Sequence, residues 1–74
     1  MVTLEAFENV DIHAIWSTGK KEQISLKTNG KHIFYYADKL KLEISNGGGV
    51  GVSTHEKDLG IPGELGKPKT LNFE

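Results

Sequence analysis

Apolar and polar residues alternate one by one along several short segments of this chain. The clearest segment is residues 39–44, in which Leu40, Leu42 and Ile44 fall on one face and charged residues fall on the other. Successive side chains of a β-strand point to opposite faces of its sheet, so this alternation predicts a strand with one buried face. No heptad or internal repeat competes with the pattern. The sequence therefore favours a mainly β protein.

An Asn29-Gly30 pair separates two further runs that favour strands, residues 23–28 and residues 31–36. Asn-Gly between such runs is the strongest short-range hairpin signal, because both turn positions need a positive φ. We expect the two runs to pair as a hairpin. A second tight turn at residues 37–39 would then lead into residues 39–44 and give a meander of three strands.

The N-terminal part of the chain fits two interpretations. A clean alternation favours a strand at residues 10–16, and a stripe with helical spacing is the alternative; the stripe consists of Leu4, Phe7, Val10 and Ala14. We prefer the strand. Residues 2–6 predict a further strand, broken or bulged near residues 7–9, and residues 17–21 predict a turn.

The second half of the chain contains most of its glycine and both prolines. Residues 45–49 predict a flexible hairpin loop, and residues 50–54 have weak strand character. Residues 55–68 are expected to be an extended irregular loop or tail, because regular structure is costly for such a composition. Residues 70–73 then fit a short edge strand that ties down the C-terminus.

Glycine-rich backbone can bind phosphate, which makes residues 47–51 and residues 60–67 candidate nucleotide sites. Phosphate-binding loops of that kind lead into a helix N-terminus, whereas residues 50–54 resemble a strand. At residues 60–67 the spacing is one residue too long, and Pro68 occupies the position that needs a Ser or Thr hydroxyl. Neither segment predicts a cofactor.

We expect a single domain at residues 1–74, since so short a chain buries only about 60% of its unfolded surface and cannot support two cores. The predicted architecture is all-β: an antiparallel sheet of about five strands, curled into a barrel or half-barrel. A Gly/Pro-rich irregular segment at about residues 55–68 follows it. Strands this short leave open edges, through which a homo-oligomer can form.

Composition argues against several classes of protein. The chain has no cysteine, which excludes disulfides and zinc–thiolate sites. Its apolar stretches are too short for a membrane span, so we expect a soluble, cytoplasmic protein without a membrane partner. The three histidines, His13, His32 and His55, are too far apart to predict a metal site. No nucleophile elbow or pair of acids stands out, so an enzyme is not expected.

Aromatic residues near lysines are the most suggestive functional feature. The predicted partner-binding residues are Trp16, Lys31, Phe34, Tyr35 and Tyr36, and six of the nine lysines lie between residues 20 and 41. Strand alternation places Phe34 and Tyr36 on one face and Tyr35 on the other. The alternative is a purely structural role, in which one face of this strand fills the core and the other is an ordinary solvent-exposed surface.

Two functions fit these residues. The first is a non-catalytic protein-binding module, such as an accessory, inhibitor or immunity-type protein of a bacterium or phage, because Tyr and Trp dominate protein–protein hot spots. The second is a binder of single-stranded nucleic acid with OB-like or cold-shock-like character. The net charge of −1 and the absence of arginine disfavour the second. A small enzyme or ligand carrier ranks third.

Overall fold

The computed structural model describes every residue from Met1 to Glu74 and contains β-strands but no helix. The strands are β1 (Val2–Ala6), β2 (Val10–Trp16), β3 (Lys21–Leu26), β4 (Lys31–Phe34), β5 (Leu40–Ile44), β6 (Val50–Thr54), β7 (Asp58–Gly60) and β8 (Lys69–Phe73). They form two four-stranded antiparallel sheets, called here sheet A (β4-β1-β6-β7) and sheet B (β3-β2-β5-β8). The all-β class is confirmed, and no helix with the length and apolar character of a membrane span is present.

The predicted barrel or half-barrel of five strands is wrong. Each sheet keeps two free edges, at β4 and β7 in sheet A and at β3 and β8 in sheet B. Among strands that follow one another in the chain, only β2–β3 and β6–β7 pair, so every other connection passes between the sheets. Alternation identifies the strands and their inner faces, but it carries no information about which strands become neighbours.

The expected Asn29-Gly30 hairpin is also wrong, because β3 and β4 belong to different sheets. Asn29 does adopt a positive φ of 72°. Its N–H donates to the carbonyl of Ala6 (2.8 Å), and the N–H of Ala6 donates to the carbonyl of Gly30 (2.8 Å). Asn29 and Gly30 therefore both lie opposite Ala6 on the neighbouring strand. This arrangement is a β-bulge, and it bends the strand from sheet B into sheet A. The positive φ of Asn29 therefore occurs at the corner between the two sheets and not in a hairpin turn.

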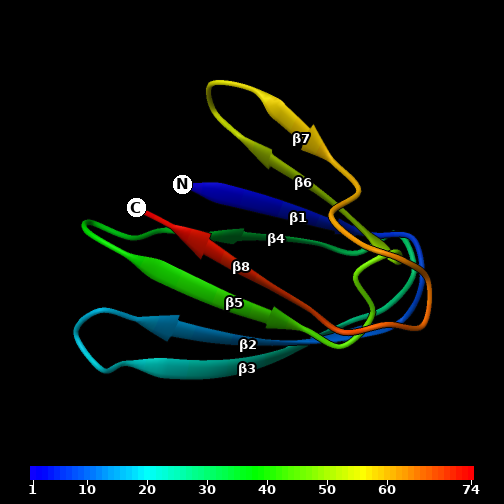
Figure 1. The fold of residues 1–74 in the computed structure, drawn as a ribbon, viewed down its shortest axis with the longest axis horizontal. Coiled ribbons are helices and arrows are strands. Elements are labelled where there is room, and N and C mark those ends of the chain that lie inside the picture. The colour runs from blue at the N-terminus through cyan, green and yellow to red at the C-terminus, as the bar shows by residue number, and fades with distance from the viewer.

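The pairing register continues through this corner. Val10 pairs with Leu26 in sheet B. In sheet A, Val2, eight residues before Val10, pairs with Phe34, eight residues after Leu26. The chain from β1 to β4 is therefore one long hairpin, bent in the middle. Strands β5 to β8 form a second bent hairpin with the two sheets exchanged. In Figure 1 the corners gather at the right-hand end, and both termini lie at the left.

The core lies between the two sheets and is entirely apolar. The alternation predicted at residues 39–44 is confirmed, since Leu40, Leu42 and Ile44 are at most 2% exposed. The strands predicted at residues 10–16, 50–54 and 70–73 are present as β2, β6 and β8. The helical alternative near the N-terminus is excluded. No buried side-chain polar atom lacks a hydrogen-bond partner.

The glycine-rich residues 45–49 do not form a flexible hairpin loop. They connect β5 in sheet B with β6 in sheet A. The N–H of Gly47 donates to the carbonyl of Lys67 (2.7 Å), and the N–H of Gly48 donates to the carbonyl of Glu64 (3.0 Å). A Cβ at Gly48 would collide with the backbone of Leu65. These glycines therefore let two loops pack backbone against backbone.

The segment at residues 55–68 is more regular than the sequence predicts. It contains β7, which pairs with β6 through a register shift at Val52 and Ser53. Its second part, residues 61–68, is held against residues 45–49 by the bonds just described. A short strand with a bulge has too little alternation to be identified in the sequence.

Candidate interaction surface

The outer faces of the two sheets differ in how much apolar side chain they expose. Six of the seven exposed large hydrophobic residues lie on strands of sheet A or one residue beyond them: Met1, Phe7, Ile33, Tyr35, Leu59 and Ile61. Their exposed fractions run from 42% to 68%. The seventh, Leu65, lies in the loop between β7 and β8. The strands of sheet B contribute none, so the exposed large hydrophobic side chains are concentrated on sheet A.

Strand alternation and small neighbours together explain why Ile33 stands out on this face. Phe34 points into the core and is 1% exposed, whereas Ile33 points outward and is 42% exposed. Across the sheet Ile33 pairs with Thr3, and Thr3 pairs with Ser53. Because the side chains in the middle of the row are short, the isoleucine at the edge has few neighbours to cover it.

A hollow of about 220 Å³ opens on the same outer face. Its wall includes Phe7 and Ile61, and its charged groups are Glu5, Lys31 and Asp58. Gly51 forms part of the floor, and a Cβ there would lie 3.1 Å from Cζ of Phe7. The ring of Phe7 therefore lies against the bare backbone of β6. We call Thr3, Glu5, Phe7, Lys31, Ile33, Tyr35, Gly51, Ser53 and Ile61 the sheet A face.

The five predicted binding residues occupy three different environments. Tyr35 and Lys31 are exposed on the sheet A face. Phe34 belongs to the core and offers no surface to a partner. Trp16 and Tyr36 are half-buried and pack against the core at the end that carries the termini. The predicted separation of Phe34 and Tyr36 from Tyr35 onto two faces is confirmed, and the structure shows that the face of Tyr35, which the sequence left open, is the exposed one.

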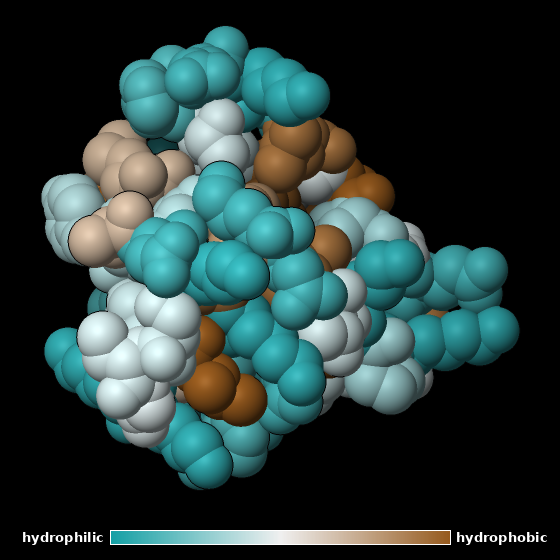
Figure 2. Space-filling model, turned by 60° about the vertical axis from the view of Figure 1, so that its left-hand side comes forward, coloured by the Kyte–Doolittle hydropathy of each residue, from teal (hydrophilic) through white to brown (hydrophobic).

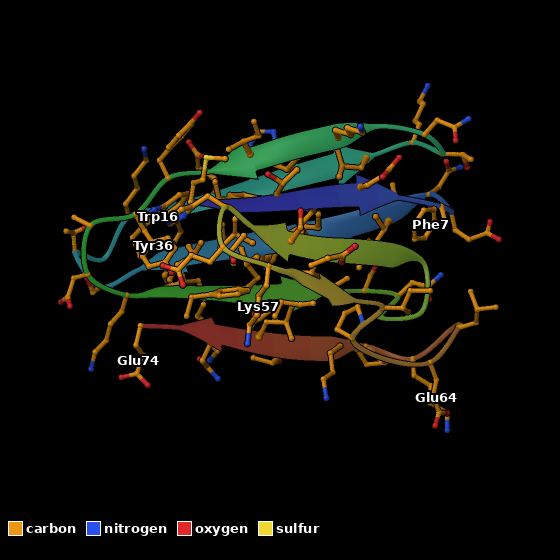
Figure 3. All side chains as sticks on the ribbon, turned by 90° about the horizontal axis from the view of Figure 1, so that it is seen from above. Phe7, Trp16, Tyr36, Lys57, Glu64 and Glu74 are labelled. Carbon is orange, nitrogen blue, oxygen red and sulfur yellow. The ribbon has the colours of Figure 1, made fainter.

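Trp16 links the two sheets at that end. Its indole N–H donates to the backbone carbonyl of Tyr35 (2.8 Å), and Nζ of Lys20 lies 5.0 Å from the centre of its ring. The ring of Tyr36 lies 6.3 Å from that of Phe73. Figure 3 shows Trp16 and Tyr36 together at one end and Phe7 at the opposite end. The predicted residues thus do not form one continuous aromatic surface.

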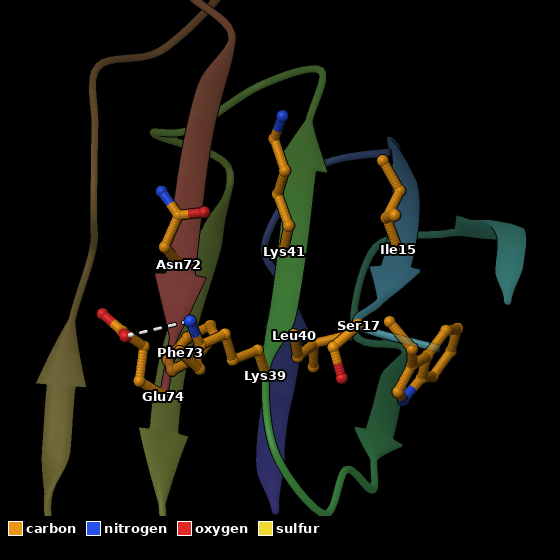
Figure 4. A pocket seen from close by; sticks show the side chains of 9 residues that line it. Ile15, Ser17, Lys39, Leu40, Lys41, Asn72, Phe73 and Glu74 are labelled. Atoms are coloured by element: carbon orange, nitrogen blue, oxygen red, sulfur yellow. Dashed lines mark ion pairs between the residues drawn. The ribbon is translucent and has the colours of Figure 1, made fainter. Parts of the chain in front are cut away.

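A second hollow, of about 470 Å³, lies beside this end on the outer side of sheet B. Figure 4 shows its lining, in which Lys39 pairs with Glu74 at 3.8 Å. Lys41 also lines it and pairs with Glu43 at 3.6 Å. Ser17 is its only hydroxyl. Both lysines of the lining are exposed and paired with carboxylates, so this open hollow holds no isolated reactive group.

The three histidines are spread over the molecule. His13 is exposed on sheet B, 4.0 Å from Glu43, and His55 is exposed beside Glu56 at 3.6 Å. His32 is half-buried, with its ring 4.5 Å from that of Phe34. No group of three or more histidine, aspartate or glutamate side chains is arranged to hold a metal ion.

Sequence reasoning missed Phe7, Ile33 and Ile61 as surface residues. Ile33 alternates with Phe34, and this was the one available signal. Phe7 and Ile61 each follow a strand of sheet A, so their exposure depends on a topology that alternation does not reveal. Figure 2 shows one side of the molecule, on which hydrophobic areas are separated by hydrophilic side chains.

Comparison with family models, with curated proteins and with solved structures finds no significant match to this chain. No residue role can therefore be transferred from a relative. The sheet A face stands as the candidate surface on its geometry and chemistry.

Proposed function

We propose that this protein is a non-catalytic protein-binding module and that the sheet A face is its binding surface. The observation that carries the proposal is the concentration of exposed Phe7, Ile33, Tyr35 and Ile61 on one sheet. Exposed apolar side chains interspersed with polar groups on one part of a surface are typical of protein interfaces, and aromatic residues dominate their hot spots. An accessory, inhibitor or immunity-type role is consistent with a domain of this size.

The charges on the face support a protein partner over nucleic acid. Glu5 and Asp58 line the same hollow as Lys31, so the local charge is mixed. Phosphate backbones are bound by surfaces on which lysines and arginines outnumber carboxylates. The chain as a whole has ten acidic and nine basic residues, and none of the basic residues is arginine.

Binding of single-stranded nucleic acid is the second candidate, and the Trp16 end is the feature that favours it. Lys20 lies over the Trp16 ring, and Lys39 is near. Stacking of a base needs a free aromatic face, however, and Trp16 and Tyr36 are both half-buried against the core. Lys20 is also paired with Glu22 at 3.7 Å. These contacts make this candidate the weaker one.

Affinity capture with the wild-type chain and matched variants tests the proposal. We expect a protein to be recovered from lysate of the source organism with or without nuclease treatment. Tyr35→Ala and Ile33→Ser should lose it, whereas Gln23→Ala on the outer face of sheet B should retain it. Recovery that disappears on nuclease treatment, or equal recovery by all variants, would contradict the assignment of protein binding to the sheet A face.

A further inference from the structure

The sheets have four edge strands, and three of them carry features that block pairing with another strand. β7 has only three residues, and Gly60 within it adopts a φ of 75°. β8 begins at Lys69 directly after Pro68. β3 begins with the exposed charged pair Lys21 and Glu22. Short length, irregular backbone, proline and charge are the usual protection of edges against further strand addition.

Strand β4 is also short and begins with the exposed Lys31, but the exposed side chains that follow, Ile33 and Tyr35, carry no charge. It pairs with β1 in an unbroken register from Phe34 to Lys31, and it contains neither glycine nor proline. It is the end strand of sheet A, so its other side has no neighbouring strand. The outward side chain in its middle is Ile33, and the exposed Tyr35 follows its last residue. A regular, unpaired edge with exposed apolar side chains is a template for a further strand.

Alternate residues of β4 point their backbone N–H and C=O groups to opposite sides of the strand, and this alternation determines which groups have no partner. The N–H of Ala6 donates to the carbonyl of Gly30, which faces β1. In an antiparallel ladder every second residue turns its N–H and C=O to the same neighbour. The groups of Lys31 and Ile33 therefore point away from β1, toward the unpaired side.

We propose that the strand added to this edge is β4 of a second copy of this chain, running antiparallel about a two-fold axis at Ile33; this inference rests on the proposed protein-binding role of the sheet A face. The free groups of Ile33 then bond reciprocally to Ile33 of the second copy. Lys31 faces Tyr35 of the second copy on the outer side, where an ammonium group and an aromatic ring attract each other. The two sheets A become one continuous sheet.

The side chains favour this register over its neighbours. An axis at Lys31 would set two lysines directly opposite each other, which destabilises a strand pair. An axis at His32 would also pair the free groups, those of Lys31 with those of Ile33 in the second copy, but it would set each isoleucine opposite a lysine. The axis at Ile33 instead brings the two isoleucines together and buries side chains that the rest of sheet A leaves 42% exposed.

The first test is the molar mass in solution over a range of concentrations, measured by sedimentation equilibrium. The chain has a mass of 8.1 kDa, and we expect the weight-average mass to rise toward twice this value as concentration increases. A contact between two strands is smaller than a standard interface, so the dimer should dissociate on dilution. Ile33→Lys should remain at the monomer mass, because it brings like charges together at the axis. Gln23→Lys, at an exposed position of edge strand β3, is the matched control and should behave as wild type.

The second test uses the absence of cysteine in the chain. Directly opposed residues of a bonded antiparallel pair have Cα atoms about 5.5 Å apart, which suits a disulfide. Ile33→Cys should therefore give a disulfide-linked dimer on mild oxidation much faster than Gln23→Cys. Tyr35→Cys should link slowly, because residue 35 faces residue 31 of the second copy and not its own equivalent.

A monomer at every concentration, or equal oxidation rates for the three cysteine variants, would overturn the second-copy proposal. Fast linkage through Tyr35→Cys with slow linkage through Ile33→Cys would overturn its register. Neither result alone contradicts the proposed protein-binding function. That function fails separately if a monomeric chain captures the same protein whether or not Tyr35 and Ile33 are replaced.

Discussion

The indole Nε1 of Trp16 donates a hydrogen bond to the backbone carbonyl of Tyr35 across 2.8 Å. Trp16 ends β2 in sheet B, whereas Tyr35 follows β4 in sheet A, so the bond ties the two layers together at the end opposite the corners. It also fixes the backbone that carries the most exposed aromatic side chain of the protein. Trp16 thus positions a binding residue without presenting a free ring of its own.

Replacing Trp16 with phenylalanine should lower the free energy of unfolding by about 1 to 2 kcal/mol. The variant removes the bond to Tyr35, leaves a carbonyl without its donor, and shortens a ring that packs against the core. Urea denaturation measures this change. Tyr35→Ala is the control and should unfold as wild type does, because its carbonyl is retained. Equal stability of Trp16→Phe and wild type would show that the bond between the layers contributes nothing.

The close packing of the two loops near Gly48 predicts that alanine destabilises the protein more at Gly48 than at Gly19. Gly48→Ala should destabilise the protein by more than about 2 kcal/mol, because the added methyl group meets the backbone near Leu65, which cannot rotate away. Gly19→Ala should cost about 1 kcal/mol, since Gly19 has a φ of 94° but open space around it. Thermal melting of both variants checks the order, and a larger loss at Gly19 would contradict the close loop packing.

The corner at Asn29 gives a further prediction. Asn29→Val should destabilise the fold by more than about 1 kcal/mol, because a β-branched residue resists the φ of 72°, whereas Asn29→Gly should be tolerated. Gly30→Val should also destabilise, since its Cβ would lie 2.9 Å from the carbonyl oxygen of Lys27. Thermal unfolding measures all three. An unchanged melting temperature for Asn29→Val would mean that the corner does not depend on the bulge at Asn29.

The sequence predicts the strands of this protein better than their arrangement. The inner faces of β2 and β5 follow from alternation, which is a local property of side chains such as Ile12 and Leu42. The pairing of β1 with both β4 and β6 depends on contacts far apart in the chain. A bulge at Asn29 and a hairpin turn need the same backbone angle, so residue type cannot distinguish them.

The candidate site was predictable to a similar extent. Tyr35 is predictable as a candidate because aromatic residues next to lysines are typical of binding surfaces. Alternation places it on the face opposite to Phe34, but alternation alone does not determine which of the two faces is exposed. Phe7 and Ile61 are not predictable as site residues, because they come close together only when β1 and β7 belong to the same sheet.

Substitutions in β5 test the core face. Leu42→Asp should unfold the domain, because Leu42 is fully buried and an unpaired carboxylate there has no compensating partner. Lys41→Asp should leave the protein folded, since it removes only the exposed pair with Glu43, worth at most about 1 kcal/mol. Far-UV circular dichroism and one-dimensional NMR distinguish the two outcomes. Comparable folding of both variants would mean that the alternating face is not the core face.

The two tyrosines that follow β4 should respond differently to substitution by alanine. Tyr35 is 68% exposed, so Tyr35→Ala should leave the melting temperature nearly unchanged but weaken partner binding by about 1 to 3 kcal/mol. Tyr36→Ala should lower the melting temperature, because its ring packs against the core beside Phe73. Raising the salt concentration should weaken binding to a protein only slightly, whereas a nucleic-acid complex would lose affinity steeply. A steep salt dependence together with full binding by Tyr35→Ala would favour the Trp16 end and nucleic acid over the sheet A face.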